Sequence, residues 1–298
     1  MSLFVDISSF GLRNVPKEMR KFILSLFIFF AALAPFLIFK NQPCPLSQVS
    51  SAVKDNIRVS FIPRAQLKSS EEIFLNYLKS RKDNLALVEI EKILSVEPDN
   101  ITALWGKAEI LRRNYKLKDS QVILNKLLSG DPRHTPSLIT LSYIRYHDNR
   151  LDEALKILRQ VLNQPNLESE DRALVYMLMG SINAKRASLG GFLSKIAYGT
   201  HVWGYFERAK VLAPDLSEVR LGLGTFCLLA PKIIGGNLEK AIEELEVAVK
   251  LTPDFATANA RLAQAYKKKG NLEKYNFYLQ RAKELDPENE VLKEIAKE

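Results

Sequence analysis

The sequence predicts an all-α solenoid of about six helical hairpins, preceded by one N-terminal transmembrane helix. Prolines recur in one local context at intervals of 34, 33, 49, 39 and 34 residues, close to the period of two-helix repeats. The six are Pro98, Pro132, Pro165, Pro214, Pro253 and Pro287. Between them, apolar residues follow the 3.6-residue period of an amphipathic helix, as in 241–251. The transmembrane helix is indicated by a single apolar run near the N-terminus.

That run, residues 22–39, reads FILSLFIFFAALAPFLIF and contains no charge. A helix of this length spans about 27 Å, just enough to cross the hydrocarbon core of a bilayer. A cleaved signal peptide is the alternative, but Pro35 follows the one plausible cleavage site at Ala34. We therefore expect an uncleaved signal anchor. Basic residues are denser before the run than after it, which predicts a cytoplasmic segment 1–21 and an exported remainder that begins with a linker, 40–66. The expected location of that remainder is the periplasm.

Composition excludes several classes of protein. Of the net charge of +9, residues 1–40 supply five basic and two acidic side chains. The remaining charge is spread thinly, without the dense basic stripe that nucleic acid requires, so no nucleic-acid partner is expected. Cys44 and Cys227 lie too far apart for a redox or zinc motif. Pro43 before Cys44 is unsuited to a lipidation signal, and Cys227 is expected to pack as a small apolar residue.

The last repeat unit carries the clearest pattern. Its first helix has a leucine, a small residue and a tyrosine at the seventh, eighth and eleventh positions, followed by a turn glycine, a small residue on the second helix and a final proline. These are Leu262, Ala263, Tyr266, Gly270, Ala282 and Pro287. The pattern resembles the tetratricopeptide repeat (TPR), and the resemblance implies units at 67–100, 101–134, 135–167, 173–216, 217–255 and 256–289. Residues 290–298 would cap the last unit.

Units four and five exceed the usual length, and each contains a Gly-Gly pair, at 190–191 and 235–236. We expect the extra residues to form loops between the two helices of each hairpin, and the two loops to be neighbours. They would display an apolar patch for a partner or a second copy of the chain, made of Phe192, Leu193, Ile196, Tyr198, Ile233 and Ile234. The alternative is that the loops pack on each other as a small separate core.

The segment LGLGTFCLLAPKIIGGNLEKAIEELEVAVKLTPDF, residues 221–255, resembles a bacterial extracytoplasmic TPR family. Its better-known members include the T-component (TatT-like) proteins of TRAP transporters, and the resemblance covers roughly residues 192–253. It implies a periplasmic, all-helical protein that works beside a solute-binding protein.

No pattern of catalytic residues is present, so we expect neither an enzyme nor a cofactor. The three histidines are scattered, and tandem carboxylates such as Glu243-Glu244 are assigned to a charged outer face. The first helix of each TPR lines the concave groove. That register places there Trp105, Glu109, Arg112, Arg113, Tyr143, Tyr146, His147, Lys185, Lys267 and Lys268. Cations mixed with aromatic rings suit an extended peptide or an acidic C-terminus.

The expected function is therefore a membrane-anchored, extracytoplasmic scaffold that binds a protein or peptide in its groove. Two alternatives stay open. One is an accessory of a TRAP-type solute transporter, and the other is a factor in cell-envelope assembly.

Overall fold

The computed structural model describes residues 67–190 and 192–297, with the side chains of 192–197 and 200 left out. Within these residues the chain is all-α, with 13 α-helices and no strand. Twelve of them form six successive antiparallel hairpins. The hairpins are α3 (Leu67–Lys79) with α4 (Asp83–Val96), α5 (Ile101–Arg113) with α6 (Leu117–Gly130), α7 (Thr135–His147) with α8 (Leu151–Leu162), α9 (Ser169–Leu189) with α10 (Phe192–Leu212), α11 (Ser217–Leu229) with α12 (Leu238–Leu251), and α13 (Ala256–Lys269) with α14 (Leu272–Leu285).

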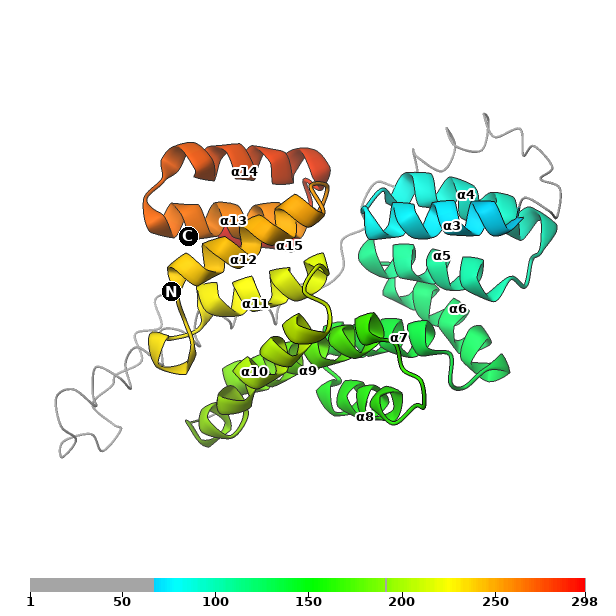
Figure 1. The fold of residues 1–298 in the computed structure, drawn as a ribbon, viewed down its shortest axis with the longest axis horizontal. Helices are drawn as coiled ribbons and strands as arrows, with labels where there is room; N and C mark the ends of the chain where they lie inside the picture. The colour runs from blue at the N-terminus through cyan, green and yellow to red at the C-terminus, as the bar shows by residue number, and fades with distance from the viewer. Residues whose placement is uncertain (1–66, 191, 298) are drawn as a thin grey trace, which may run out of the picture.

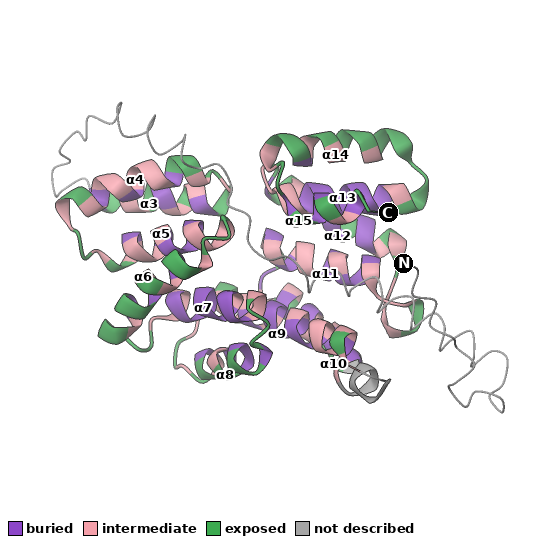
Figure 2. Cartoon of the chain, turned by 180° about the vertical axis from the view of Figure 1, so that it is seen from behind, coloured by how far each residue is buried: buried purple, intermediate pink, exposed green. Residues whose placement is uncertain are grey.

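The hairpins stack along a tightly curved path. In Figure 1 the first hairpin, α3 and α4, and the last, α13 and α14, face each other across the molecule, while α7 to α10 join the two sides. The first helix of each hairpin lies toward the inside of this curve. Figure 2 shows α7, α9 and α13 carrying more buried residues than α14, whose outer face is largely exposed. The fold is a helical-hairpin solenoid that bends back toward its own start.

Small residues set the distance between the two helices of a hairpin. Ala241 on α12 is fully buried, and a Cβ on Gly224 of α11 would lie 2.7 Å from Leu245 Cγ. Only alanine or glycine leaves room for so close an approach. Asparagines begin several helices: the Asn237 side chain accepts a hydrogen bond from Lys240 N at 3.0 Å, and Asn271 does the same for Lys274 N at 3.0 Å.

The expectation of a long loop in unit four was wrong. Its extra residues lengthen both helices, so that α9 and α10 have 21 residues each and the chain reverses at Gly190. The reason is that the added turns bury apolar side chains against each other, with Ala187 and Val202 almost fully buried. Helix also satisfies the backbone hydrogen bonds that a loop would leave open. The helix α9 begins at Ser169, ahead of the expected unit start at residue 173.

The extra residues of unit five do form a connection. It contains a short 3₁₀ turn, η5 (Lys232–Ile234), followed by Gly235 at φ +112°, a conformation that favours glycine. A Cβ on Gly236 would fall 1.8 Å from the Ala230 carbonyl oxygen, so this position also requires glycine. The Ile234 side chain approaches Gly199 on α10, which places the two insertions side by side, as expected.

Three residues of the expected apolar patch have described side chains, and these three differ in exposure. Ile233 is 65% exposed, whereas Ile234 is half-buried against α10. Tyr198 is half-buried, with the Arg186 guanidinium 5.3 Å from its ring centre. The side chains of Phe192, Leu193 and Ile196 lie outside the described set. Ile234 therefore packs on the unit-four insertion, Tyr198 lies against α9 of its own hairpin, and Ile233 stays exposed.

The short helix α15 (Glu290–Ile295) covers the end of the last hairpin. Its three apolar residues, Val291, Leu292 and Ile295, pack with Ala260 and Ala282. None of the helices that the structure describes has the length and hydropathy needed to cross a bilayer. The expected anchor at residues 22–39 and the linker at 40–66 lie outside the described residues.

Candidate functional site

The inner side of the curve encloses a cavity of about 620 Å³. The first helix of all six hairpins lines it, with α10, the unit-five turn and α15 adding further walls. One part of the wall, from α9, α10 and α11, is mainly apolar and includes Leu174, Met177, Leu178, Phe206, Leu221 and Phe226. Cavities of this size hold small ligands or a few residues of a bound chain.

The structure brings together eight of the ten residues expected in the groove. The cavity is lined by Trp105, Glu109, Arg112, Arg113, Tyr143, Tyr146, His147 and Lys185. Lys267 and Lys268, in the last turn of α13, do not line it. The Lys267 Nζ instead lies 5.9 Å from the Tyr275 ring centre, and Lys268 Nζ approaches the Leu228 carbonyl oxygen at 3.5 Å.

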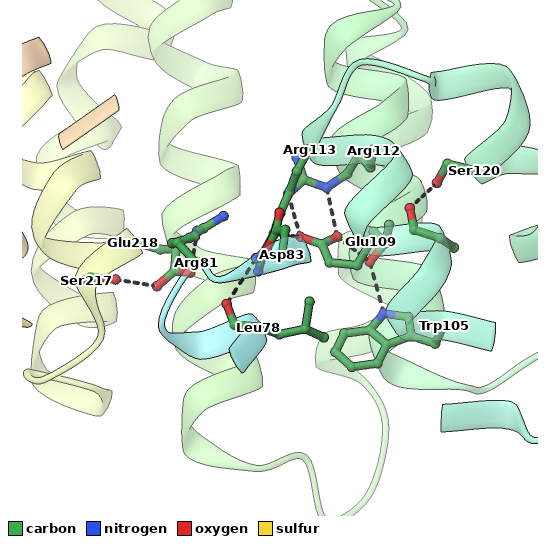
Figure 3. Close-up of polar contacts among 12 residues, drawn as sticks. Leu78, Arg81, Asp83, Trp105, Glu109, Arg112, Arg113, Ser120, Ser217 and Glu218 are labelled. Carbon is green, nitrogen blue, oxygen red and sulfur yellow. Dashed lines mark hydrogen bonds and ion pairs between the residues drawn. The ribbon is translucent and has the colours of Figure 1, made fainter. Parts of the chain in front are cut away.

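A buried carboxylate, Glu109 on α5, organises the polar wall. It accepts hydrogen bonds from Arg112 Nε at 2.8 Å and from Arg113 Nε at 2.9 Å, both on its own helix. Thr140 Oγ1 on α7 also donates to it, at 3.1 Å, and Thr140 in turn accepts from Trp105 Nε1 at 3.1 Å. Figure 3 shows Glu109 between the two arginines and above Trp105. The cluster therefore connects the second and third hairpins.

The same cluster reaches the first hairpin through Arg113. Its Nη1 donates to Asp83 Oδ1 at 2.7 Å and to the Leu78 carbonyl oxygen at 3.0 Å. Burial alone would raise the pKa of the Glu109 carboxyl. The charge and hydrogen bonds of Arg112 and the charge of Arg113 outweigh burial and hold this pKa well below its ordinary value. Arg112 and Arg113 are thus already paired within the chain and are not free cations awaiting a ligand.

Aromatic rings form the adjoining wall. The Arg112 guanidinium lies 4.5 Å from the Tyr143 ring centre, and Lys185 Nζ lies 4.5 Å from that of Tyr146. The His147 ring makes edge contacts with Tyr115 and Tyr146, each with 5.6 Å between ring centres. Burial, together with the charges of Arg112 and Lys185, lowers the pKa of His147 to about 3, so the imidazole is neutral at pH 7.

Most of the cavity lining was missed by the sequence analysis, including five residues at turns and helix ends. Arg81 and Tyr115 are in turns between helices, Glu218 is in the first turn of α11, Phe255 precedes α13, and Glu290 begins α15. A signal for the first two was present in the repeat register. Counted from residues 67 and 101, Arg81 and Tyr115 occupy the fifteenth position, which Gly270 occupies in the last unit. Arg81 and Tyr115 thus depart from the repeat pattern at a position where it has glycine, and the sequence alone could have shown this.

The assignment of Glu244 to an outer face was wrong. Its side chain is 1% exposed and forms ion pairs with Lys210 Nζ at 2.5 Å and Arg220 Nη1 at 2.8 Å, between α10, α11 and α12. It is a structural contact outside the cavity lining. Cys227 is buried, as expected, and burial raises the pKa of its thiol to about 11. No group of three or more potential metal ligands occurs among the residues that the structure describes.

Fold and cavity define the class, a helical-repeat solenoid with a cavity on its inner side. The chain contains tetratricopeptide repeats. One family model, described as TPR repeat, matches residues 233–270, and another, described as Tetratricopeptide repeat, matches residues 256–289.

Two curated relatives are similar over longer stretches. One is a DnaJ homolog subfamily C member 7 homolog from Dictyostelium discoideum, 26% identical over 214 residues, which cover 72% of this chain and 39% of that protein. The other is a surface lipoprotein assembly modifier from Pasteurella multocida (strain Pm70), 25% identical over 152 residues, which cover 50% of this chain and 29% of that protein. The chain thus spans well under half the length of either relative.

Among solved structures, human IFIT1 in its dimer with m7Gppp-AAAA has a TM-score of 0.56 and 17% sequence identity. The likeness covers 80% of this chain and 54% of that one. At this identity the match concerns the fold alone.

Proposed function

We propose that this protein is a non-enzymatic TPR scaffold that binds an extended segment of a partner protein in its central cavity. The observation that carries the proposal is that the first helices of all six hairpins converge on one cavity of about 620 Å³. A segment placed there touches many repeats at once. Extended segments in helical-repeat grooves gain affinity from such distributed contacts, while side-chain pockets supply the selectivity.

The lining also indicates how a segment is recognised. Because Arg112 and Arg113 are paired with Glu109 and Asp83, they offer little net charge to a ligand. Recognition falls instead to the rings of Tyr143 and Tyr146 and to the apolar wall from α9 to α11. Aromatic side chains are common binding hot spots. The favoured partner segment therefore carries apolar or aromatic side chains.

The test fills the cavity without disturbing the ion cluster. Ser181 lines the cavity, and its hydroxyl donates to the Met177 carbonyl oxygen at 3.1 Å. Ser129 on α6 is exposed and makes the same kind of contact, donating to the Asn125 carbonyl oxygen at 2.8 Å. We expect Ser181→Trp to abolish affinity capture of the partner from solubilised membranes, and the matched Ser129→Trp to leave it intact. Capture that survives in both folded variants means that the cavity is not the binding site.

The proposal includes an extracytoplasmic location, with residues 22–39 as an uncleaved anchor and the N-terminus in the cytoplasm. Its support is the length of the apolar run and Pro35 after the only plausible cleavage site. Sequencing the N-terminus of the membrane-extracted protein tests it. A mature chain that starts beyond residue 34 removes the anchor from the proposal.

A second candidate function is a TatT-like accessory of a TRAP-type transporter, which would hold a small solute in the same cavity. The apolar wall from α9 to α11 and Ile234 favours it, because small-ligand sites are mostly apolar with a few polar groups. TRAP permease and solute-receptor genes next to this gene would support this candidate. A role in cell-envelope assembly fits the name of the Pasteurella relative, and in that case the captured partner is an envelope protein.

A further inference from the structure

Two turns in the first half of the molecule hold large side chains in a backbone conformation suited to glycine. Arg81 has φ +60° and Tyr115 has φ +56°. At the same position of their units stand Asn149, with φ +61°, and Gly270, with φ +81°. Asparagine and glycine tolerate this left-handed region, whereas bulky residues there are strained. Such strain persists where other contacts hold the residue in place.

Arg81 makes its contacts across the cavity. Its Nη2 donates to Glu218 Oε1 on α11 at 2.6 Å, between residues 137 positions apart. Its guanidinium also lies 4.1 Å from the Phe255 ring centre, just before α13. The side chains of Arg81 and Glu218 are 13% and 20% exposed, so water screens the pair less than it screens a surface ion pair. Figure 3 shows Arg81 extending toward Glu218 and Ser217 on the facing helix.

Tyr115 faces the last third of the chain from the second turn. Tyr115 and Glu290, at the start of α15, line the same cavity, and the Glu290 carboxylate is the charge that acts most strongly on the Tyr115 hydroxyl. Burial and the negative charge of Glu290 both raise the pKa of Tyr115, so the hydroxyl keeps its proton at neutral pH. Asn149 provides the contrast, because it is exposed and does not line the cavity. Of the three non-glycine turn residues at this position, only the two bulky ones line the cavity, together with residues from the last third of the chain.

We infer that Arg81, paired with Glu218, and Tyr115, facing Glu290, form a clasp that holds the first two hairpins against the C-terminal hairpins, and that the cavity admits a partner segment when this clasp opens. The inference rests on the proposed function for its biological meaning, but not for its structural test. A further observation fits a clasp that opens. Arg81 Nε is the one fully buried side-chain nitrogen or oxygen without a hydrogen-bond partner among the described residues. An unsatisfied donor makes the closed state less stable than a fully bonded one, which eases opening.

The first experiment measures access to the cavity with a chemical probe. A cysteine replaces Ser181 in a full-length chain that also carries Cys44→Ser, and its reaction with N-ethylmaleimide is timed. The native Cys227 is 1% exposed and reacts slowly. We expect Arg81→Gly, Tyr115→Gly and Glu218→Gln each to raise the rate about tenfold, the effect of weakening closure by about 1.4 kcal/mol. Asn149→Gly is the matched control, since it also introduces a turn glycine but touches neither contact, and its rate should equal that of the parent chain.

The second experiment measures the opening itself. Nitroxide labels on cysteines that replace Asn84 on α4 and Asn276 on α14, both exposed, report the separation of the first and last hairpins. The distance distribution should move to longer values in the Arg81→Gly and Glu218→Gln variants and stay unchanged in Asn149→Gly. Glu218→Gln keeps the Arg81 turn intact, so its effect reports the ion pair and not backbone flexibility.

The outcomes separate the clasp from the proposed function. Equal modification rates and equal distances in the Arg81→Gly, Glu218→Gln and Asn149→Gly variants overturn the clasp. If the clasp variants open the cavity while Ser181→Trp still captures partners, the clasp stands and the cavity as partner site fails.

Discussion

The last hairpin and the first two hairpins have helices of nearly equal length but carry different residues at the same turn position. In α13 and α14 the turn residue is Gly270, with no atom within 4 Å of where a Cβ would be. In the first two hairpins the corresponding residues are Arg81 and Tyr115, both in the cavity lining. The family models match residues 233–289 and none of the first half.

The comparison shows that the repeat pattern specifies packing within a hairpin and not contacts between hairpins. The pattern residues Leu262, Ala263 and Ala282 are fully buried inside the last hairpin and govern helix packing. The departures in the first hairpins govern contacts between distant hairpins, which the period of a single repeat does not encode. Residues that follow the TPR pattern pack the two helices of a hairpin together. Residues that depart from it, Arg81 and Tyr115, line the cavity between distant hairpins.

The largest expected effect comes from removing the carboxylate that joins the first three hairpins. Glu109→Ala leaves Arg112 and Arg113 buried without their shared partner. Breaking a buried ion pair in this way typically costs about 3–5 kcal/mol. We expect a loss of that size in the free energy of unfolding, measured in urea.

The control for this variant is Glu72→Ala on α3, where the carboxylate is exposed. Exposed substitutions of this kind usually change stability by less than about 0.5 kcal/mol. Similar losses in the two variants would mean that the ion cluster does not stabilise the first hairpins, and the contrast with the last hairpin would fail.

A second prediction concerns hairpin packing where the chain follows the family pattern. Ala241→Trp places an indole in the contact between α11 and α12, where Ala241 is fully buried. Overpacking of this kind costs about 1–3 kcal/mol or more. On the same helix, the side chain of Glu239 is 71% exposed, and Glu239→Trp loses only a surface pair with Lys269. Thermal melting should separate the two variants clearly, and equal melting temperatures would show the helix register to be wrong.

Much of the fold could be predicted from the sequence, because its main determinants are periodic. Prolines, small residues and apolar stripes recur at fixed spacing, and the six observed hairpins follow them. The lengthening of α9 and α10 was missed because Gly190-Gly191 signals a turn but not the length of the helices on either side. Residues such as Ala187 and Val202 reveal that length only because the folded hairpin buries them.

The cavity could be predicted less completely. Repeat register places Arg112, Arg113, Tyr143 and Tyr146 on the inner face, and the structure lines the cavity with all four. Register does not tell whether a cation is free or paired. That depends on Glu109 and Asp83, and on a curvature that brings Glu218 to Arg81 from 137 residues away. The curvature is the sum of small rotations between hairpins, which no single repeat specifies.

The smallest expected effect concerns a carboxylate that lacks the pairing found in the first hairpins. Partial burial and the neighbouring charges of Glu168 and Glu170 raise the pKa of Asp171, in the first turn of α9, from 3.8 to about 6. Because the folded pKa is raised, ionisation of this group favours the unfolded chain. The penalty is absent below pH 3.8 and complete above pH 6. Asp171→Asn should therefore stabilise the protein at pH 7.5 by about 1 kcal/mol, allowing for solvent screening, and leave stability unchanged at pH 3.5.

Glu170→Gln serves as the control, since Glu170 pairs with Lys79 at 3.1 Å and its neutralisation removes a favourable contact. Chemical unfolding at the two pH values measures both variants, and an equal gain for Asp171→Asn at pH 3.5 and 7.5 would show that charge is not the cause.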